Sequence, residues 1–401
     1  MLLPKFSLPF PEEDSVFKVA TAARAAKISG AKVLDASLGA LYDEEGVLVT
    51  YKSAFDALRS LDNAQMAAYA PITGGAAFKE TVKSWILPDN CPYKKQAEVS
   101  SSMGGSGALY LALSQFFDEG DNILLFSPYW APYNLFTQAR KLSPNTVPLL
   151  KDNKEFNKEE TKSKLEELAR TGKRIGIVLN TPANNPTGYS LSKEEWDFLI
   201  ELINELSKQA NIVLINDIAY VDYCKDLEKS KSYMNDLAKL SENVLLAFCV
   251  SFSKTLSYYG LRLGAMIYYN KNEDTLTELR RRITLANRYT WSNPNHGALL
   301  SLNKLDIDAY KEENAKYKSM LQERAEIFMK KADEIGLKYL PYKEGFFICV
   351  PGCADNEKYA QRLAKANVFV LNQNTVLRIA ICSLTKKECE EIAVILKEQE
   401  N

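Results

Sequence analysis

Residues 244–254, VLLAFCVSFSK, begin with an unbroken apolar run, Val244–Val250, that ends abruptly in Ser-Phe-Ser-Lys. A continuous apolar run of this length is typical of a strand that is buried on both faces, as in a parallel sheet. Three other runs have the same form and also end in polar residues: Asn122–Phe126 (NILLF), Ile175–Leu179 (IGIVL) and Ile212–Ile215 (IVLI). The four runs predict strands of a parallel sheet.

Helix signals lie between these strands. Ser192–Glu195 has the capping-box pattern of a helix start, and apolar residues follow it at helical spacing from Trp196 to Leu206. Residues 157–170 predict a second, more charged helix, with Asn157 as its N-cap. The alternation of strand and helix indicates an α/β fold built from βαβ units.

The C-terminal part of the chain follows a different pattern. We expect a long charged helix over about residues 310–335, short strands over Gly345–Val350 and Thr375–Ile381, and a last helix that opens with a capping box at Thr385–Glu388. This order of elements has α+β character and predicts a second, smaller domain.

The composition argues against several functional classes. The 401 residues include 50 Lys and Arg and 51 Asp and Glu, and the net charge of −1 disfavours nucleic acid or an anionic membrane as the main partner. No apolar run approaches the roughly 20 residues of a membrane span, and we see no secretion signal. The seven cysteines form no CxxC pair, which favours a reducing cytoplasm. His296 is the only histidine, so no metal site is expected.

Polar side chains follow the predicted strands at the carboxyl ends, where open parallel sheets bind ligands. In chain order they are Asn180 and Asn185, then Asp217 and Tyr220, then Ser251 and Lys254. The glycine-rich segment 104–107 precedes a further apolar stretch, and glycines with free amides at a helix start favour an anion. We therefore expect a lysine, an acid, a phenol, an amide and a phosphate site to converge.

This combination is what pyridoxal phosphate (PLP) requires. A lysine forms a Schiff base with the cofactor, and its freed amine can later carry a proton. An acid keeps the pyridine nitrogen protonated, while a phenol and an amide near the ring oxygen tune the lysine linkage. Lys254, Asp217 and Tyr220 are therefore the predicted catalytic residues.

The chain resembles the class I aminotransferases of PLP fold type I, and most closely their aspartate and aromatic branch. The motifs that carry the resemblance occur in the family's order from about Gly39 to Arg378: YAPITGG, SPYWAPY, NNPTG, DIAY, SFSK followed by GLRLG, RYTWSNP and LRIA. The resemblance implies a large, mainly parallel-sheet PLP domain over residues 47–298. It also implies a smaller α+β domain from residues 1–46 and 299–401.

The resemblance further implies a role for each matched residue. For the cofactor these are Lys254 for the Schiff base, Asp217 for the ring nitrogen, Tyr220 and Asn185 for the ring oxygen, Trp130 for stacking, Gly105, Ser106, Ser251 and Arg262 for the phosphate, and Tyr69 for the phosphate of a neighbouring subunit. For the substrate they are Arg378, Gly39 and Asn185 around the α-carboxylate, and Arg288 for a side-chain carboxylate across the dimer. Tyr133 departs from the pattern, since some aspartate enzymes have a histidine there, behind the cofactor aspartate.

The implied activity is transamination between an L-amino acid and a 2-oxo acid, by a homodimer with shared active sites. Arg288 favours aspartate, glutamate and 2-oxoglutarate, with aromatic amino acids as further donors. The same cofactor residues would serve a PLP-dependent β-lyase or decarboxylase. A non-catalytic PLP-binding regulator is disfavoured, because the family pattern begins by Gly39 and leaves no room for a DNA-binding domain.

Overall fold

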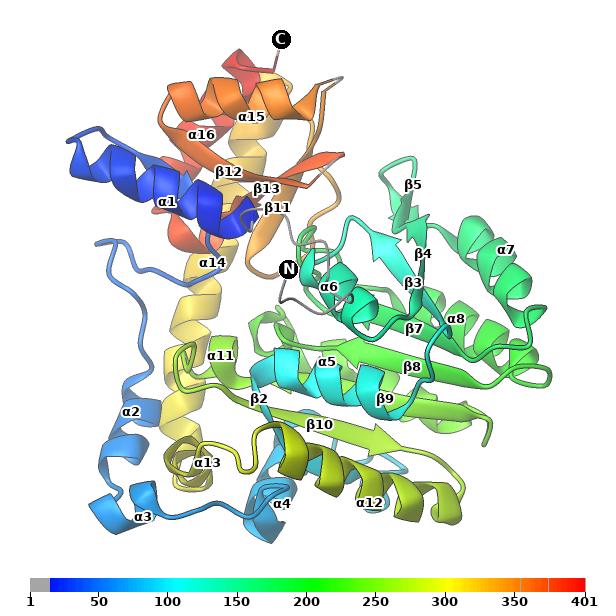
Figure 1. The fold of residues 1–401 in the computed structure, drawn as a ribbon. Coiled ribbons are helices and arrows are strands. Elements are labelled where there is room, and N and C mark those ends of the chain that lie inside the picture. Colours follow the sequence, from blue (N-terminus) through cyan, green and yellow to red (C-terminus); the bar gives the residue numbers. More distant parts are fainter. Residues whose placement is uncertain (1–14, 354, 374, 401) are drawn as a thin grey trace, which may run out of the picture.

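Two β-sheets organise the part of the chain that the structure describes, residues 15–353, 355–373 and 375–400. Figure 1 shows this computed structural model, with a seven-stranded sheet in its middle and a four-stranded sheet above it. The chain therefore has a large α/β part and a smaller α+β part, which confirms the predicted fold class. The residues predicted to bound the two domains stay a prediction.

The large sheet carries the strands predicted from the apolar runs. Its strands, in spatial order, are β2 (Glu98–Met103), β10 (Leu263–Tyr269), β9 (Val244–Ser251), β8 (Ile212–Asp217), β7 (Ile175–Asn180), β3 (Asn122–Ser127) and β4 (Ser143–Pro148). β10 runs antiparallel to both of its neighbours, and the other pairs are parallel. The four apolar runs correspond to β3, β7, β8 and β9, and each strand begins at the predicted residue. Their carboxyl ends meet at one edge of the sheet.

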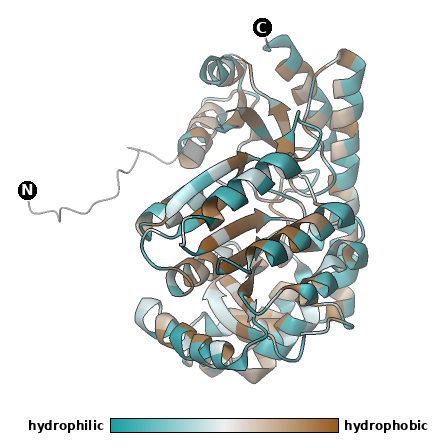
Figure 2. Cartoon of the chain, turned by 90° about the vertical axis from the view of Figure 1, so that its right-hand side faces the viewer, coloured by the Kyte–Doolittle hydropathy of each residue, from teal (hydrophilic) through white to brown (hydrophobic). Residues whose placement is uncertain are grey.

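Helices cover both faces of this sheet. One face packs against α5 (Gly104–Gln115), α6 (Pro132–Ala139) and α12 (Glu273–Thr290), and the other against α4 (Gly75–Ile86), α7 (Lys158–Ala169), α8 (Lys193–Leu206), α9 (Leu227–Lys231) and α10 (Tyr233–Asp236). Figure 2 shows hydrophobic strands in the centre and hydrophilic outer faces on the helices. The predicted caps of α7 and α8 are confirmed: Asn157 caps α7, and Ser192 and Glu195 form a capping box.

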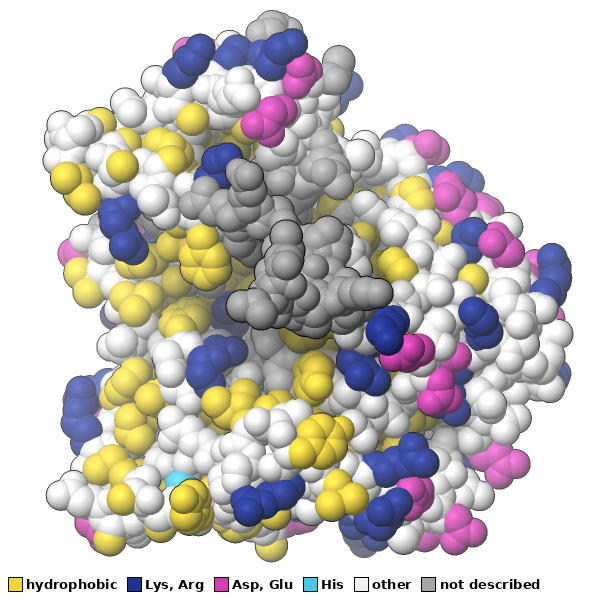
Figure 3. Space-filling model, viewed as in Figure 1, with side chains coloured by type: hydrophobic (Ala, Val, Ile, Leu, Met, Phe, Trp, Pro, Cys, Tyr) yellow, Lys and Arg dark blue, Asp and Glu magenta, His cyan; other side chains and the backbone are white. Residues whose placement is uncertain are grey.

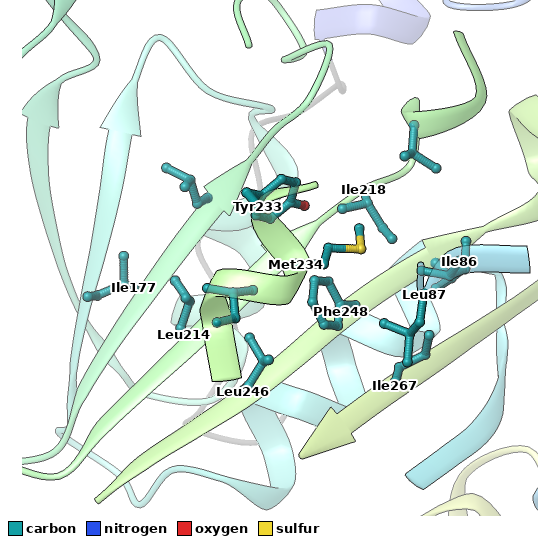
Figure 4. Close-up of a cluster of buried hydrophobic side chains, with 14 of the residues drawn as sticks. Ile86, Leu87, Ile177, Leu214, Ile218, Tyr233, Met234, Leu246, Phe248 and Ile267 are labelled. Carbon is teal, nitrogen blue, oxygen red and sulfur yellow. The ribbon is translucent and has the colours of Figure 1, made fainter. Parts of the chain in front are cut away.

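Apolar side chains from strands and helices interlock between the layers. Figure 4 shows a part of this core in which Leu214 of β8, Leu246 and Phe248 of β9 and Ile267 of β10 lie near Met234 of α10. Each of these five side chains is at most 1 % exposed. Burial on this scale stabilises by roughly 25 cal/mol per Å² of apolar surface, and it holds the strand ends in fixed positions.

The small sheet is mixed. Its strands lie in the order β1 (Leu34–Ala36), β12 (Val368–Gln373), β13 (Val376–Ala380) and β11 (Phe347–Pro351), and only β1 and β12 pair in parallel among these described strands. They pack against α14 (Ile307–Ile335), α15 (Asn356–Lys365) and α16 (Lys386–Glu398). The capping box at Thr385 is confirmed. α14 begins three residues before the predicted 310, because Asp306 caps it.

The remaining elements are short or lie at the edges. They are α1 (Ser15–Ile28), α2 (Lys52–Arg59), α3 (Asn63–Ala67), β5 (Leu150–Lys151), β6 (Glu155–Phe156), η1 (Val221–Tyr223), η2 (Leu237–Lys239), α11 (Phe252–Thr255), α13 (His296–Asn303) and η3 (Ile381–Ser383). α14 extends along the left side of Figure 1 from the level of α13 up to the small sheet. Within the described ranges, no helix combines the length and the apolar character needed to cross a membrane.

Candidate active site

A cavity of about 200 Å³ lies at the carboxyl ends of β7, β8 and β9, where ligands bind in open parallel sheets. The predicted site residues in its lining are Gly105, Ser106, Trp130, Asn185, Asp217, Tyr220, Ser251, Lys254 and Arg262. Asn180, Ala219 and Ser253 also line it. The structure therefore brings together nine of the residues that were assigned a cofactor, substrate or catalytic role from the sequence, together with Asn180 from the predicted strand ends.

Lys254 reaches the cavity from α11, which directly follows β9. Its Nζ lies 4.8 Å from the ring centre of Tyr259 and 5.9 Å from that of Tyr220. Burial, reinforced by the positive charges of Arg262 and Arg378, lowers the pKa of the amine from 10.5 to about 8. At neutral pH a much larger fraction of this amine is neutral and nucleophilic than in an ordinary lysine.

Asp217 is the last residue of β8, and its carboxylate is buried. Tyr133 Oη donates to one carboxylate oxygen at 2.7 Å, and the Ala219 N–H donates to the other at 3.1 Å. Asn180 Nδ2 donates to the Asp217 main-chain oxygen at 2.8 Å. Burial raises the pKa of the carboxyl group, and the two hydrogen bonds and the charge of Lys254 oppose that rise. Within the described part of the chain the carboxylate has donors but no ion-pair partner, so a protonated ring nitrogen would supply the missing cation.

Asn185 connects the phenol of Tyr220 to the guanidinium of Arg378. Asn185 Nδ2 donates to Tyr220 Oη at 3.3 Å, and Asn185 Oδ1 accepts from Arg378 Nη1 at 3.2 Å. Arg378 Nη2 donates to the Ser37 main-chain oxygen at 2.6 Å, and the guanidinium carbon lies 4.3 Å from the ring centre of Phe347. Arg378 Nε is buried and has no hydrogen-bond partner among the described residues. A buried cation with a free donor is a suitable seat for a carboxylate.

The N-terminus of α5 forms a cup for an anion beside the lysine. Its first residues are Gly104, Gly105 and Ser106, and the first amides of a helix have no partner within the helix. A Cβ on Gly104 would lie 2.4 Å from Arg262 Nη2, and one on Gly105 would lie 3.0 Å from Ser251 Cβ. The two glycines therefore allow the helix start and the Arg262 cation to face the same cavity, as a phosphate group requires.

Trp130 and Tyr133 form an aromatic pair beside Asp217. Their ring centres are 5.5 Å apart and their planes are perpendicular, at 90°. Tyr133 thus fixes the Trp130 ring through an edge contact and the carboxylate through its hydroxyl. Burial raises the pKa of Tyr133 well above its ordinary value, so the hydroxyl is a neutral donor. How much this departure from histidine changes the tuning of Asp217 stays a prediction.

Four predicted residues lie outside the cavity lining: Arg378, described above, and Gly39, Tyr69 and Arg288. A Cβ on Gly39 would lie 2.7 Å from the Phe347 ring, the ring that also contacts the Arg378 guanidinium. Tyr69 is 89 % exposed, and Arg288 is exposed near the end of α12. The predicted roles of Tyr69 and Arg288 in the site of a neighbouring subunit stay predictions.

Sequence reasoning missed several contacts of the site. Phe347 supports Arg378 from a strand that is distant in sequence, and no local pattern indicates that contact. Tyr259 faces the Lys254 amine, and its Oη accepts a hydrogen bond from the Leu41 N–H at 3.2 Å. Its position between Lys254 and Arg262 in the sequence is the one signal that could have suggested it.

The arrangement fits PLP. A lysine with a lowered pKa, a buried carboxylate without a cation, a phenol with an amide, and an anion cup walled by glycines all face one cavity. The unpartnered Arg378 Nε lies beyond Asn185, where a substrate carboxylate would complete its hydrogen bonds.

Comparison with known proteins agrees with this geometry. The family model for class I and II aminotransferases matches residues 31–396. The aromatic-amino-acid aminotransferase of Escherichia coli (strain K12) is 24 % identical over 328 residues, which cover 78 % of this chain and 80 % of that protein. The probable aspartate/prephenate aminotransferase of Aquifex aeolicus (strain VF5) is 28 % identical over 321 residues, which cover 77 % of this chain and 74 % of that protein.

Solved structures give the same result. The crystal structure of an aminotransferase from Anaerococcus prevotii DSM 20548 superposes with a TM-score of 0.95 at 29 % identity, covering 100 % of both chains. An aromatic-amino-acid aminotransferase from Burkholderia pseudomallei, solved covalently bound to pyridoxal phosphate, has the same fold, with a TM-score of 0.80 at 19 % identity over 100 % of both chains.

Proposed function

This chain belongs to the class I and II aminotransferases and is a PLP-dependent enzyme of transamination, and from this premise we propose the role of each site residue and a substrate class. The observation that carries the residue roles is the single cavity onto which Lys254, Asp217 and the N-terminus of α5 open. The reaction exchanges the amino group of an amino acid for the oxo group of a 2-oxo acid.

Each residue around the cavity would bind or act on a different part of the cofactor. When bound, PLP supplies an aldehyde for the lysine and a ring that draws electrons from the substrate carbon. Arg262, Ser251 and the first amides of α5 would hold the phosphate, and Asp217 would hold the proton on the ring nitrogen. Lys254 Nζ would bond to the cofactor and, when released, move the proton that leaves the substrate α-carbon.

The substrate α-carboxylate would bind Arg378. Its Nη1 and Nη2 already donate to Asn185 and Ser37, which fixes the plane of the guanidinium, and Nε remains available. Gly39 packs against the Phe347 ring, and that ring also contacts the Arg378 guanidinium. We therefore propose that the main chain of Gly39 would border the bound carboxylate. Holding the substrate carboxylate and the cofactor in this way would bring the substrate α-carbon toward the Lys254 amine.

The lowered pKa of Lys254 predicts how the rate of PLP capture depends on pH. Only the neutral amine attacks an aldehyde, so the rate at which cofactor-free protein forms its visible absorbance band should rise about tenfold per pH unit and level off above about 8. Stopped-flow absorbance measures this rate, with Lys254→Ala as the control that forms no band. A rate that continues to rise toward pH 10.5, the ordinary lysine value, would contradict the lowered pKa.

We propose a dicarboxylate as the preferred substrate, read through Arg288 of a second subunit. Arg288 is exposed, its Nη1 donates to the nearby Ser292 hydroxyl at 2.5 Å, and it keeps the RYTWSNP spacing of the aspartate branch. A planar guanidinium suits bidentate binding of a second carboxylate. The names of the relatives, aspartate and aromatic-amino-acid aminotransferases, support aspartate or glutamate as one donor and aromatic amino acids as others.

A homodimer would place Arg288 and Tyr69 in the partner's site. Asn293 Nδ2 donates to the Ala70 main-chain oxygen at 2.6 Å, which ties the segment after Arg288 to the segment after Tyr69. Exposed apolar side chains lie on the same elements, α3, its following loop and α12: Met66, Tyr69, Leu285 and Tyr289. Figure 3 shows hydrophobic side chains, with basic ones among them, on the lower part of the molecule. A second copy of the chain would bury them.

Arg288→Ala tests the substrate class. We expect kcat/KM for aspartate and 2-oxoglutarate to fall about 10- to 100-fold, because a charge-assisted contact is lost, while phenylalanine changes by less than about threefold. Steady-state kinetics with both donors measure this difference. Arg281→Ala is the matched control, since Arg281 lies on the same helix and pairs with Glu278. It should leave kcat/KM for both donors unchanged. Equal losses for both donors would reduce Arg288 to a structural ion-pairing residue.

Two further proposals concern the chain as a whole. We propose the domain bounds 47–298 for the large domain, with 1–46 and 299–401 in the small one. We also propose a cytoplasmic location, since all seven cysteines are free thiols.

A further inference from the structure

Two adjacent residues of η1 hold the helical turn that carries Lys254. Tyr223 Oη donates to the Lys254 main-chain oxygen at 2.9 Å. Thr255 Oγ1 donates to Asp222 Oδ2 at 2.7 Å. Asp222, Tyr223 and Thr255 are all buried, at 3 %, 3 % and 4 % exposure. α11 is only one turn long, so it depends on side-chain contacts such as these two to hold its position.

The hydrogen bond from Tyr223 to Lys254 is the last in a series of hydrogen bonds that all run in one direction. A carbonyl oxygen only accepts, so the Tyr223 hydroxyl proton is committed to Lys254 and its oxygen must accept from Tyr51 Oη, 2.8 Å away. Tyr51 Oη in turn accepts from Asn314 Nδ2 at 3.1 Å. Asn314 lies on α14, the helix that continues into the small domain. Every donor in the chain thus has one assigned acceptor.

Asp222 is fixed in the same manner. Trp85 Nε1 lies 3.1 Å and 3.3 Å from its two carboxylate oxygens, so the indole N–H and the Thr255 hydroxyl both donate to it. Trp85 also stacks edge-on against Phe252, the first residue of α11, with ring centres 6.0 Å apart. The carboxylate therefore ties the lysine turn to α4.

We propose that Tyr223 and Asp222 are positioning residues that fix the main chain of Lys254, and thereby the point at which its amine meets the substrate α-carbon. The inference rests on the proposed role of Lys254. A lysine stem has four rotatable carbons, so its amine is placed accurately only when its Cα is held. Burial raises the pKa of Tyr51 and Tyr223 well above 10.0, so these hydroxyls remain neutral and hold position without carrying protons.

Tyr223→Phe removes the hydroxyl and keeps the ring, which contacts Phe346. We expect kcat of the PLP-loaded enzyme to fall about tenfold or more, because misplacement by a fraction of an ångström weakens catalysis, while KM and the Kd for PLP change less than about twofold. The pH midpoint of the visible absorbance should also move. Tyr93→Phe is the matched control, since Tyr93 Oη donates to a main-chain oxygen, that of Met234, at 2.9 Å and is equally buried. It should lower thermal stability similarly and leave kcat and the midpoint unchanged.

Thr255 provides the test of Asp222. Thr255→Val keeps the shape but removes the donor to the carboxylate, and it should lower kcat and move the absorbance midpoint as Tyr223→Phe does. Thr255→Ser keeps the hydroxyl and should restore both values to within about twofold of the wild type. If the loss of kcat came from poorer packing alone, Thr255→Val would lose least and Thr255→Ser most. This order is the opposite of the one that the positioning role predicts.

A parallel Lys254→Ala variant tests the role of Lys254 separately from the positioning proposal. If it loses the visible band while Tyr223→Phe behaves as Tyr93→Phe does, the positioning proposal is wrong and the role of Lys254 stands. If Lys254→Ala keeps the band, the proposed function of the lysine itself is wrong. If Tyr223→Phe and Thr255→Val lose kcat with unchanged KM and Thr255→Ser does not, the positioning role is established.

Discussion

Lys254→Ala should have no measurable turnover and no visible absorbance band from bound PLP. The substitution removes both the amine that bonds to the cofactor and the base that moves the substrate proton, so we expect at least about a 10⁴-fold loss in kcat. The remaining lining, including Arg262 and the α5 start, should still bind PLP non-covalently through its phosphate. Absorbance spectra and steady-state kinetics on the same preparation measure both effects.

Lys343→Ala is the control for this variant. Lys343 resembles Lys254 in being partly buried beside an aromatic ring, with its Nζ 4.1 Å from the ring centre of Tyr189, and burial lowers its pKa too. It does not line the cavity. The control should keep its band and its activity. Normal turnover in Lys254→Ala would refute the assignment of the lysine.

Asp217→Ala should bind PLP yet lose most of its rate. The buried carboxylate holds the proton on the ring nitrogen, and without that charge the ring draws electrons from the substrate carbon less strongly. Losses of about 10²- to 10³-fold in kcat are typical when one buried electrostatic partner is removed from an active site. Single-turnover kinetics with saturating PLP measure the chemical step apart from cofactor binding.

Asp217→Asn tests the charge of the side chain apart from its size and shape. The amide keeps the shape and an acceptor for the Tyr133 hydroxyl, now 2.7 Å from the carboxylate, but it cannot pair with a protonated nitrogen. It should therefore lose nearly as much rate as the alanine variant. An unchanged kcat in Asp217→Asn would mean that the carboxylate supports Tyr133 and Trp130 and does not tune the cofactor.

Much of the fold could be predicted because its strands are buried on both faces. β3, β7, β8 and β9 are apolar throughout, so their first residues were clear in the sequence. Helix starts were clear where a side chain caps the helix, as at Ser192 and Thr385. Both signals are local, and local signals can be read from one sequence.

Other strands gave no such signal. β2 reads Glu98–Met103 (EVSSSM), and its serines are buried by distant segments, since Asn287 Nδ2 of α12 donates to Ser100 Oγ and Gly107 of α5 packs against Ser102, which only the tertiary structure reveals. β4 contains Pro144 and Pro148 at the edge of the sheet, where the missing N–H groups are tolerated. Both sequences look like loops when read alone.

The same division holds for the site. Asp217 is the last residue of β8, and Lys254 and Asn185 lie in the segments that follow β9 and β7, so the parallel sheet predicted that they would converge. Phe347 below Arg378 and Tyr223 beneath Lys254 depend on contacts across the fold, between segments that no spacing relates.

The most direct test of the central claim is the absorbance spectrum of the purified, PLP-loaded protein before and after addition of L-aspartate, and in a second sample L-phenylalanine. The account predicts a visible band that disappears with either donor, more readily with aspartate. One equivalent of 2-oxo acid should form per subunit without ammonia or carbon dioxide, and the band should return when 2-oxoglutarate is added. A protein that forms no band with PLP, or one that releases ammonia or carbon dioxide in place of the oxo acid, would contradict it.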